Sequence, residues 1–124
     1  MTLMSRAAPL ILVEDVIATA EHYRDVLGFT FEGFWGDPPQ FTFVDRDEVR
    51  IGLMQAPAAS RPPTPSGFSD VLIYVDNVDV LAEDFRGRGA RIVVEPTDNR
   101  VYNGRDLAIA DCNGRIISFV QMLE

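Results

Sequence analysis

The chain contains the same succession of segments twice, and few folds accommodate such a repeat. Each copy begins with an apolar run of strand length, residues 9–13 in the first and 71–75 in the second. A favourable helix N-cap residue follows, Asp15 or Asn77, and a helix-length segment then ends at Gly28 or Gly89. A unit of this size cannot bury a sheet alone, so the repeat predicts two copies that share one core.

The segments between these landmarks have the periodicity of one helix and three further strands per copy. The apolar residues expected on the buried helix faces are Val16, Ala20, Tyr23 and Leu27 in the first copy, and Val78, Leu81, Ala82 and Phe85 in the second. The strand-like segments are 29–35, 41–45 and 49–54, then 91–95, 106–110 and 115–121. Turn residues at 36–39, 45–47 and 111–114 separate several of them.

A proline-rich stretch separates the two copies. Residues 56–67 contain four prolines in twelve positions, which neither a helix nor a central strand accommodates. The sequence therefore predicts an α+β fold in one domain, residues 1–124. Within it we expect a first βαβββ module at 6–55, an extended linker at 56–67 and a second βαβββ module at 68–122.

Charge and composition exclude several classes of function. The chain has 11 basic and 19 acidic side chains and a net charge of −8, which gives no basis for binding a phosphate backbone. The same charge attracts cationic small molecules, although it also serves solubility alone. The apolar run 7–13 stops at Glu14 and is far too short to span a membrane. We therefore expect a cytoplasmic protein with no nucleic-acid or membrane partner, and the single cysteine, Cys112, excludes an internal disulfide.

Two motifs, in order, resemble those of a known family. The first has an Ala-Pro pair at 8–9, Glu-Asp-Val at 14–16 and EHYRDVLGF at 21–29. The second is NGRDLAIADCNGRIISFVQ at 103–121, in which Cys112 stands where the family usually has proline. Together they resemble the vicinal-oxygen-chelate superfamily of glyoxalases, bleomycin-resistance proteins and dioxygenases, and most of all the bleomycin-resistance proteins. The likeness spans roughly residues 7–121.

The resemblance implies a curved mixed sheet from each module, with its helix on the convex side, and a cup formed by the two modules. In bleomycin-resistance proteins the ligand grooves lie between the subunits of a dimer whose first strands are exchanged. Pro9 matches the proline at which the main fold begins after the exchanged arm. We therefore expect a homodimer, and exchange of the N-terminal strand as a further feature of it.

Metal-dependent members of the superfamily take their ligands from the first and the last strand of each module. Those positions hold Ala8, Gly52, Asp70 and Ser118 in this chain. Only Asp70 suits a hard cation, whereas a catalytic divalent metal usually has about three protein ligands. The resemblance therefore implies a protein with no metal and no cofactor, and it argues against glyoxalase or extradiol dioxygenase chemistry.

The strands are expected to line a cup, since alternate strand residues share a face. The register that points the four positions inward adds Leu10, Leu12, Arg50, Met54, Leu72, Tyr74, Ile116 and Val120. The candidate ligand-binding residues are Trp35, Phe41, Phe43, Arg50, Met54, Asp70, Leu72, Tyr74, Tyr102 and Ser118. Trp35 is the preferred stacking residue, while Phe41 and Phe43 also suit ordinary sheet packing. Arg50 and Asp70 either contact a ligand or pair with one another.

The leading hypothesis is a metal-free binding protein of the bleomycin-resistance type. It would sequester an aromatic or cationic small-molecule ligand in a dimeric groove, with antibiotic resistance as its role. One alternative is an enzyme of the superfamily with a divergent metal site, in which Asp70 acts as a general base or a lone metal anchor. Another is a partner-binding module with a degenerate cup.

Overall fold

Strands and helices follow one another largely in the order that the repeat predicts. The computed structural model describes residues 1–124. The elements are β1 (Leu10–Val13), α1 (Val16–Leu27), β2 (Phe41–Arg46), β3 (Val49–Gln55), β4 (Val71–Tyr74), α2 (Val78–Arg88), β5 (Arg91–Asn99), β6 (Gly104–Ala110) and β7 (Ile116–Met122). The linker carries one 3₁₀ turn, Ala58–Ser60.

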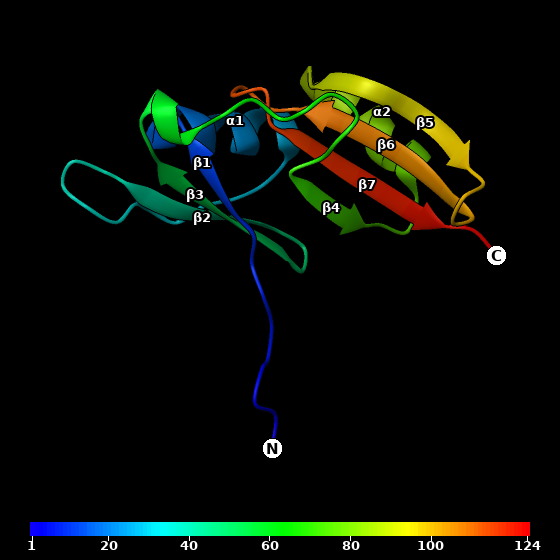
Figure 1. The fold of residues 1–124 in the computed structure, drawn as a ribbon, viewed down its shortest axis with the longest axis horizontal. Coiled ribbons are helices and arrows are strands. Elements are labelled where there is room, and N and C mark those ends of the chain that lie inside the picture. Colours follow the sequence, from blue (N-terminus) through cyan, green and yellow to red (C-terminus); the bar gives the residue numbers. More distant parts are fainter.

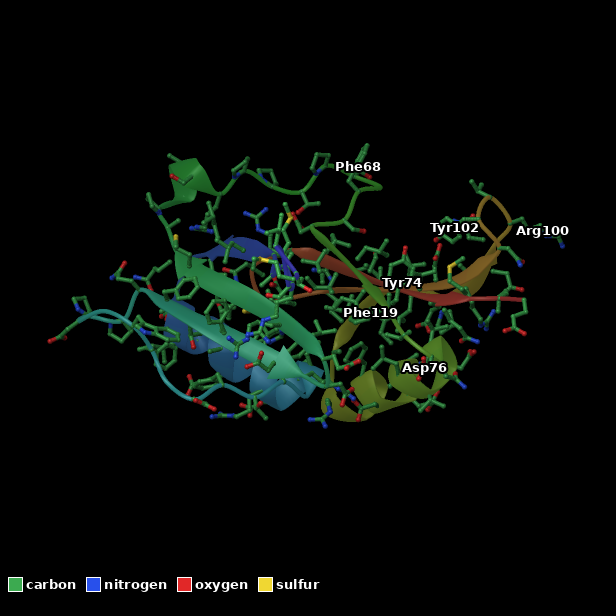
Figure 2. The ribbon with its side chains drawn as sticks, turned by 90° about the horizontal axis from the view of Figure 1, so that it is seen from below. Phe68, Tyr74, Asp76, Arg100, Tyr102 and Phe119 are labelled. Atoms are coloured by element: carbon green, nitrogen blue, oxygen red, sulfur yellow. The ribbon has the colours of Figure 1, made fainter.

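The strands form two mixed sheets, one in each half of the chain (Figure 1). The first sheet has the order β1-β3-β2, and the second has the order β4-β7-β6-β5. In each sheet the first strand runs parallel to the last, and the other pairs are antiparallel. Both helices lie on the same side of the sheets, and the linker passes over the other side, which we call the open face (Figure 2). This arrangement confirms the predicted α+β fold, in which each half contributes one helix and one mixed sheet.

Both helices begin and end where the sequence predicts. The Asp15 side chain accepts hydrogen bonds from two first-turn amides of α1 at 3.0 Å, and Asn77 caps α2 in the same way. Gly28 and Gly89 follow the helices with φ of 75° and 82°, in the left-handed region that glycine adopts without steric cost. Neither helix is long and apolar enough to cross a membrane.

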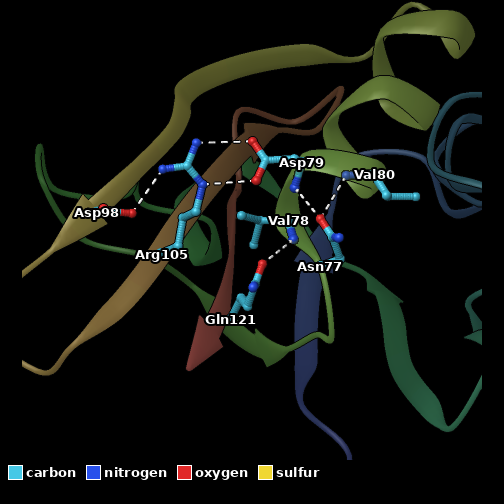
Figure 3. A network of polar contacts seen from close by, with 7 residues as sticks. All are labelled: Asn77, Val78, Asp79, Val80, Asp98, Arg105 and Gln121. Carbon is cyan, nitrogen blue, oxygen red and sulfur yellow. Dashed lines mark hydrogen bonds and ion pairs between the residues drawn. The ribbon is translucent and has the colours of Figure 1, made fainter. Parts of the chain in front are cut away.

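A glutamine in the last strand of each half also holds the start of the helix. The Gln55 side chain accepts a hydrogen bond from the Val16 amide, and Gln121 accepts one from the Val78 amide, both at 3.0 Å. Figure 3 shows the second of these contacts beside the Asn77 cap. The repeat therefore extends from the order of the elements to single hydrogen bonds.

One expected strand is not formed. Residues 29–35 join β2 only through two isolated bridges, from Thr30 to Asp45 and from Trp35 to Phe41. The two bridges are five residues apart in the segment 30–35 but four apart in β2. A regular pairing register therefore cannot run through the segment. The first sheet therefore has three strands where four were expected.

The two halves share a single core. One cluster of buried apolar side chains draws on both helices and both sheets, with Tyr23, Val44, Phe85 and Ile109 almost fully buried in it. The expected helix faces are confirmed, except that Leu81 is only partly buried. Burial of one face of each sheet leaves the open face as the surface that the core does not use.

A turn from each half also reaches the helix of the other half. The Tyr23 hydroxyl of α1 donates to the buried Asp111 carboxylate, in the turn between β6 and β7, at 2.7 Å. Arg46, where β2 turns into β3, donates to Asp84 of α2 at 3.0 Å and to the Leu27 carbonyl at 2.8 Å. These reciprocal contacts hold the two sheets beside one another.

Candidate functional site

The open face exposes many large apolar side chains. Strand alternation turns the residues between the core positions toward this side. Several are in contact with solvent in the single chain: Leu10 (57% exposed), Trp35 (60%), Leu72 (55%) and Tyr74 (70%). Single exposed apolar residues are ordinary, whereas a group of them marks a surface that binds something. The open face is therefore the candidate functional site.

On the first sheet the open face is an aromatic platform. Trp35, Phe41 and Phe43, which we call the aromatic cluster, have ring centroids 4.9 to 5.9 Å apart. Their tilted and edge-to-face geometry is favourable for aromatic pairs. The Arg50 guanidinium lies 4.6 Å from the Phe43 ring centroid and pairs with Asp45 at 2.7 Å. This surface suits a planar molecule that stacks on the exposed Trp35 ring.

Gly52 lets two apolar side chains close over the middle of the first sheet. It pairs with Leu10 and Phe43 on the neighbouring strands. A Cβ atom at this position would overlap the Leu10 side chain and come within 3.2 Å of the Phe41 ring. Glutamate, the metal ligand that the resemblance implies here, would displace the Leu10 side chain.

On the second sheet the open face is hollowed to a volume of about 720 Å³. Phe68, just after the linker, and Leu72 of β4 line one side of this hollow, and Tyr102, in the hairpin between β5 and β6, lines the other. Figure 2 shows Phe68 and Tyr102 on the side of the sheet away from α2. Ser118 lies on the floor, where its hydroxyl is hydrogen-bonded to that of Ser69.

The hollow contains a carboxylate, that of Asp106 on β6. It accepts hydrogen bonds from the Tyr102 hydroxyl and from the Asn99 side-chain amide, the latter at 3.1 Å. Burial, followed by the hydrogen bond to Asp106 and its charge, raises the pKa of Tyr102 to about 12, so the phenol remains a donor at neutral pH. The Tyr102 ring lies against Gly104, where a Cβ atom would come within 2.5 Å of it.

The hollow also contains Phe68, Asn99 and Asp106, which are not among the candidates that the sequence suggests. Asp106 could have been predicted from the sequence. In the expected strand 106–110, alternation turns its side chain to the face opposite that of the core residue Leu107. Asn99 and Phe68 lie outside every strand expected from the sequence, so alternation gives their side chains no direction.

Nine of the ten candidate residues form two groups on the open face. The first sheet has Trp35, Phe41, Phe43, Arg50 and Met54, and the second half has Leu72, Tyr74, Tyr102 and Ser118. Arg50 and Tyr74, one from each group, line a common cleft of about 520 Å³ between the sheets. The two groups are therefore neighbours on one surface.

Asp70, the tenth candidate, lines the same cleft as Arg50 and Tyr74, and it is also held within the chain. Its side chain accepts hydrogen bonds from the Ile116 amide at 2.8 Å and from the Thr64 hydroxyl at 2.6 Å. The alternative in which Arg50 pairs with Asp70 is wrong, because Arg50 pairs with Asp45. Through its Oδ2 atom, Asp70 ties the end of the linker to the start of β7, which is a structural task.

The four positions that the resemblance implies for a metal do not fit one. Ala8 and Gly52 have no side-chain donor atom, Ser118 shares its hydroxyl with Ser69, and Asp70 is engaged by the linker and β7. No three side chains of histidine, cysteine, aspartate or glutamate come together in a way that could hold a metal ion. A divalent metal would therefore lack a set of protein ligands here.

Solved structures of known proteins share this fold. The bleomycin-binding protein from bleomycin-producing Streptomyces verticillus, complexed with copper(II)-bleomycin, is 22% identical with a TM-score of 0.75, and 100% of each chain is covered. The bleomycin resistance determinant encoded on the transposon Tn5 is 19% identical with a TM-score of 0.79, covering 98% of this chain and 100% of that one. TnmS3, an antibiotic binding protein from a Streptomyces species, is 20% identical with a TM-score of 0.71, covering 99% and 100%.

At these identities the solved structures establish the fold, and the sequence match establishes the family. No curated protein matches the chain. The Glyoxalase/Bleomycin resistance protein/Dioxygenase superfamily, in contrast, matches residues 5–119, nearly the whole length. With the architecture of two helices and two mixed sheets in agreement, the chain belongs to the glyoxalase/bleomycin resistance protein/dioxygenase superfamily.

Proposed function

We propose that this protein is a metal-free, non-enzymatic binding protein of the bleomycin-resistance type, which sequesters an aromatic or cationic small molecule. The observation that carries the proposal is the open face, with an exposed aromatic cluster on one sheet and a hollow that contains a carboxylate on the other. Binding alone requires such a surface and no catalytic group.

The relatives of known structure support this proposal through what they bind. The Streptomyces verticillus protein is complexed with copper(II)-bleomycin, and TnmS3 is an antibiotic binding protein. The net charge of −8 favours a cationic ligand for the present chain. Bleomycin is therefore the first ligand to test, and resistance through sequestration is the role that we propose.

Two copies of the chain complete the groove in this proposal. β1 and β4 are edge strands, and a cleft lies between their sheets. Residues 1–8 make no backbone hydrogen bond, and Figure 1 shows the N-terminal arm running away from the body. The arm carries the exposed Leu3 and Met4, which suit contact with a second copy. These features support a homodimer with exchanged first strands.

The proposal keeps the organisation expected from the sequence. The modules at 6–55 and 68–122, joined by the linker at 56–67, would act together within each chain. A cytoplasmic setting stays a prediction.

Thermal unfolding in the presence of metal-free bleomycin tests the proposal. A ligand that binds only the folded state stabilises it by about 2.7 kcal/mol at a hundred times its Kd, which raises the Tm by several degrees. Trp35→Ala removes the exposed ring of the aromatic cluster and should abolish most of the shift. Val80→Ala shortens an exposed side chain on α2 instead and should preserve the shift.

Two outcomes would count against the proposal. No shift of the wild-type protein at saturating bleomycin would exclude bleomycin as the ligand. A shift of the same size in Trp35→Ala as in Val80→Ala would place the bound molecule away from the aromatic cluster.

A further inference from the structure

The carboxylate of Asp106 has no cation to balance it. Strand alternation turns Asp106 toward the open face, whereas Arg105 points to the other side and pairs with Asp79 and Asp98 at 2.9 Å (Figure 3). No ion pair of the protein includes Asp106. Its hydrogen-bond partners, Tyr102 and Asn99, are neutral.

These two partners orient the carboxylate without neutralising it. The Tyr102 hydroxyl donates to Oδ1 and the Asn99 amide donates to Oδ2. Because each carboxylate oxygen has two lone pairs, one acceptor position on each oxygen stays available for a bound group. The arrangement therefore presents a fixed negative charge with spare acceptors.

The surroundings of Asp106 strengthen its attraction for a cation. Phe68, Leu72, Ala108 and Ile116 line the same hollow and are apolar, so they lower the dielectric in which a charge pair would form. The Tyr102 ring beside the carboxylate adds the attraction of an aromatic face for a positive charge. The hollow of about 720 Å³ has room for a ligand group larger than a metal ion or water.

We propose that this hollow recognises the cationic end of an aromatic ligand, an amine, guanidinium or sulfonium group. Asp106 is its counter-charge, and Tyr102 is a positioning residue that holds the carboxylate. The inference rests on the proposed function. It narrows the ligand class from a molecule that is aromatic or cationic to one that is both.

Two acridines that differ in charge test this inference. At pH 7.5, 9-aminoacridine is protonated and acridine is neutral, while their ring systems match. Fluorescence titration of the wild-type protein should give a dissociation constant for 9-aminoacridine about ten times lower than for acridine. Asp106→Asn retains an acceptor for Tyr102 and removes the charge, so it should bring the two constants within about two-fold of one another.

Asp98→Asn is the matched control. It removes the same charge from the neighbouring strand, on the opposite side of the sheet, where Arg105 still has its pair with Asp79. Its preference for 9-aminoacridine should equal that of the wild type. An unchanged preference in Asp106→Asn, or an equal loss of preference in both variants, would overturn the inference.

Amide NMR shifts of the wild-type protein give a test that needs no variant to fold. We expect 9-aminoacridine to shift the amides of Tyr102, Asp106 and Ala108, and acridine to shift them less. Shifts confined to the first sheet overturn the inference but leave the proposed function standing, since a molecule still binds the open face. If neither acridine binds saturably, the inference is overturned, whereas the proposed function is decided by the bleomycin experiment.

Discussion

The Tyr23 hydroxyl joins the two halves through one buried contact. It donates to Asp111 at 2.7 Å. Tyr23→Phe keeps the ring but removes a hydrogen bond to a buried carboxylate, so the free energy of unfolding should fall by about 1.5–3 kcal/mol. Tyr74→Phe, at an exposed residue, should change it by less than about 0.5 kcal/mol. Urea unfolding measures both changes. Equal losses in the two variants would mean that the hydrogen bond from Tyr23 to Asp111 does not stabilise the fold.

The same tyrosine gives the stability a pH dependence in alkaline solution. Burial, followed by the charge of Asp111 and the hydrogen bond to it, raises the pKa of Tyr23 well above its ordinary value of 10.0. Above pH 10 the unfolded chain releases the phenol proton while the folded chain keeps it. The stability that Tyr23 contributes is therefore complete below pH 10 and declines as the pH rises further.

Tyr23→Phe should therefore lose less stability than the wild type between about pH 9 and pH 11. Urea unfolding at a series of pH values provides the comparison. Parallel losses in the two proteins would show that another group carries the alkaline dependence.

His22, the single histidine, gives the stability a pH dependence in acidic solution. Its Nε2 atom is buried without a hydrogen-bond partner. Burial lowers the pKa of His22 below its ordinary 6.5, although the charges of Asp111 and Asp25 act in the opposite direction. The unfolded chain binds the proton first as the pH falls, so this residue reduces the stability below pH 6.5.

An NMR titration of the imidazole protons checks this directly, because only one histidine contributes. We expect a midpoint under 6.5. A midpoint above that value would show that the two aspartates outweigh burial.

Strand alternation explains which site residues the sequence reveals. It places Leu72, Tyr74 and Ser118 on the open face, where the structure also has them. It gives no sign that Asp70, just before β4, bonds to the Ile116 amide of another strand. A hydrogen bond between residues 46 positions apart leaves no local pattern in the sequence.

At the scale of elements, the contact of Arg46 with α2 is the counterpart of the Tyr23 contact. Arg46 donates to the Leu27 carbonyl and pairs with Asp84, both partly buried. Arg46→Gln should lower the free energy of unfolding by about 1–3 kcal/mol, because the Leu27 carbonyl loses this donor and Asp84 keeps only Arg88. Arg24→Gln breaks the exposed pair with Asp25 and should cost less than about 1 kcal/mol.

Chemical denaturation of the two arginine variants makes the comparison with the same change of charge. A cost for Arg24→Gln that matches or exceeds that for Arg46→Gln would contradict a joining role for the turn between β2 and β3.

The helices were predictable as elements and one strand was not. Asp15 and Asn77 act as caps through their own side chains, so residue identity alone signals the helix starts. The segment 29–35 has the composition of a strand, yet the rings of Phe31 and Phe34 pack 5.3 Å apart. Residues three apart point to opposite faces of a strand, so this contact requires an irregular backbone.

For the whole molecule, the repeat was sufficient to predict two units around one core. It did not reveal how the units meet, because contacts such as Tyr23 with Asp111 join residues 88 positions apart. The exposed open face and the arm at residues 1–8 point beyond the single chain, to a surface that another copy would complete.

Light scattering, which measures the mass of the protein in solution, tests whether two copies of the chain associate. The intact protein should have twice the mass of the chain, and a variant without residues 1–8 should shift toward a single chain, since the arm carries the exposed Leu3 and Met4. The deletion removes no backbone hydrogen bond of the fold, so an unchanged circular dichroism spectrum serves as its control. A single-chain mass for the intact protein at micromolar concentration would contradict the dimeric groove.

One titration tests most directly the claim that the open face binds a small molecule without a metal ion held by the protein. The protein is first treated with a chelator and dialysed, and metal-free bleomycin is then added in a calorimeter. We expect saturable heat with one ligand bound per chain, and the same affinity without the chelator treatment. An absence of heat, or binding only after a divalent metal ion is returned to the protein, would contradict the claim.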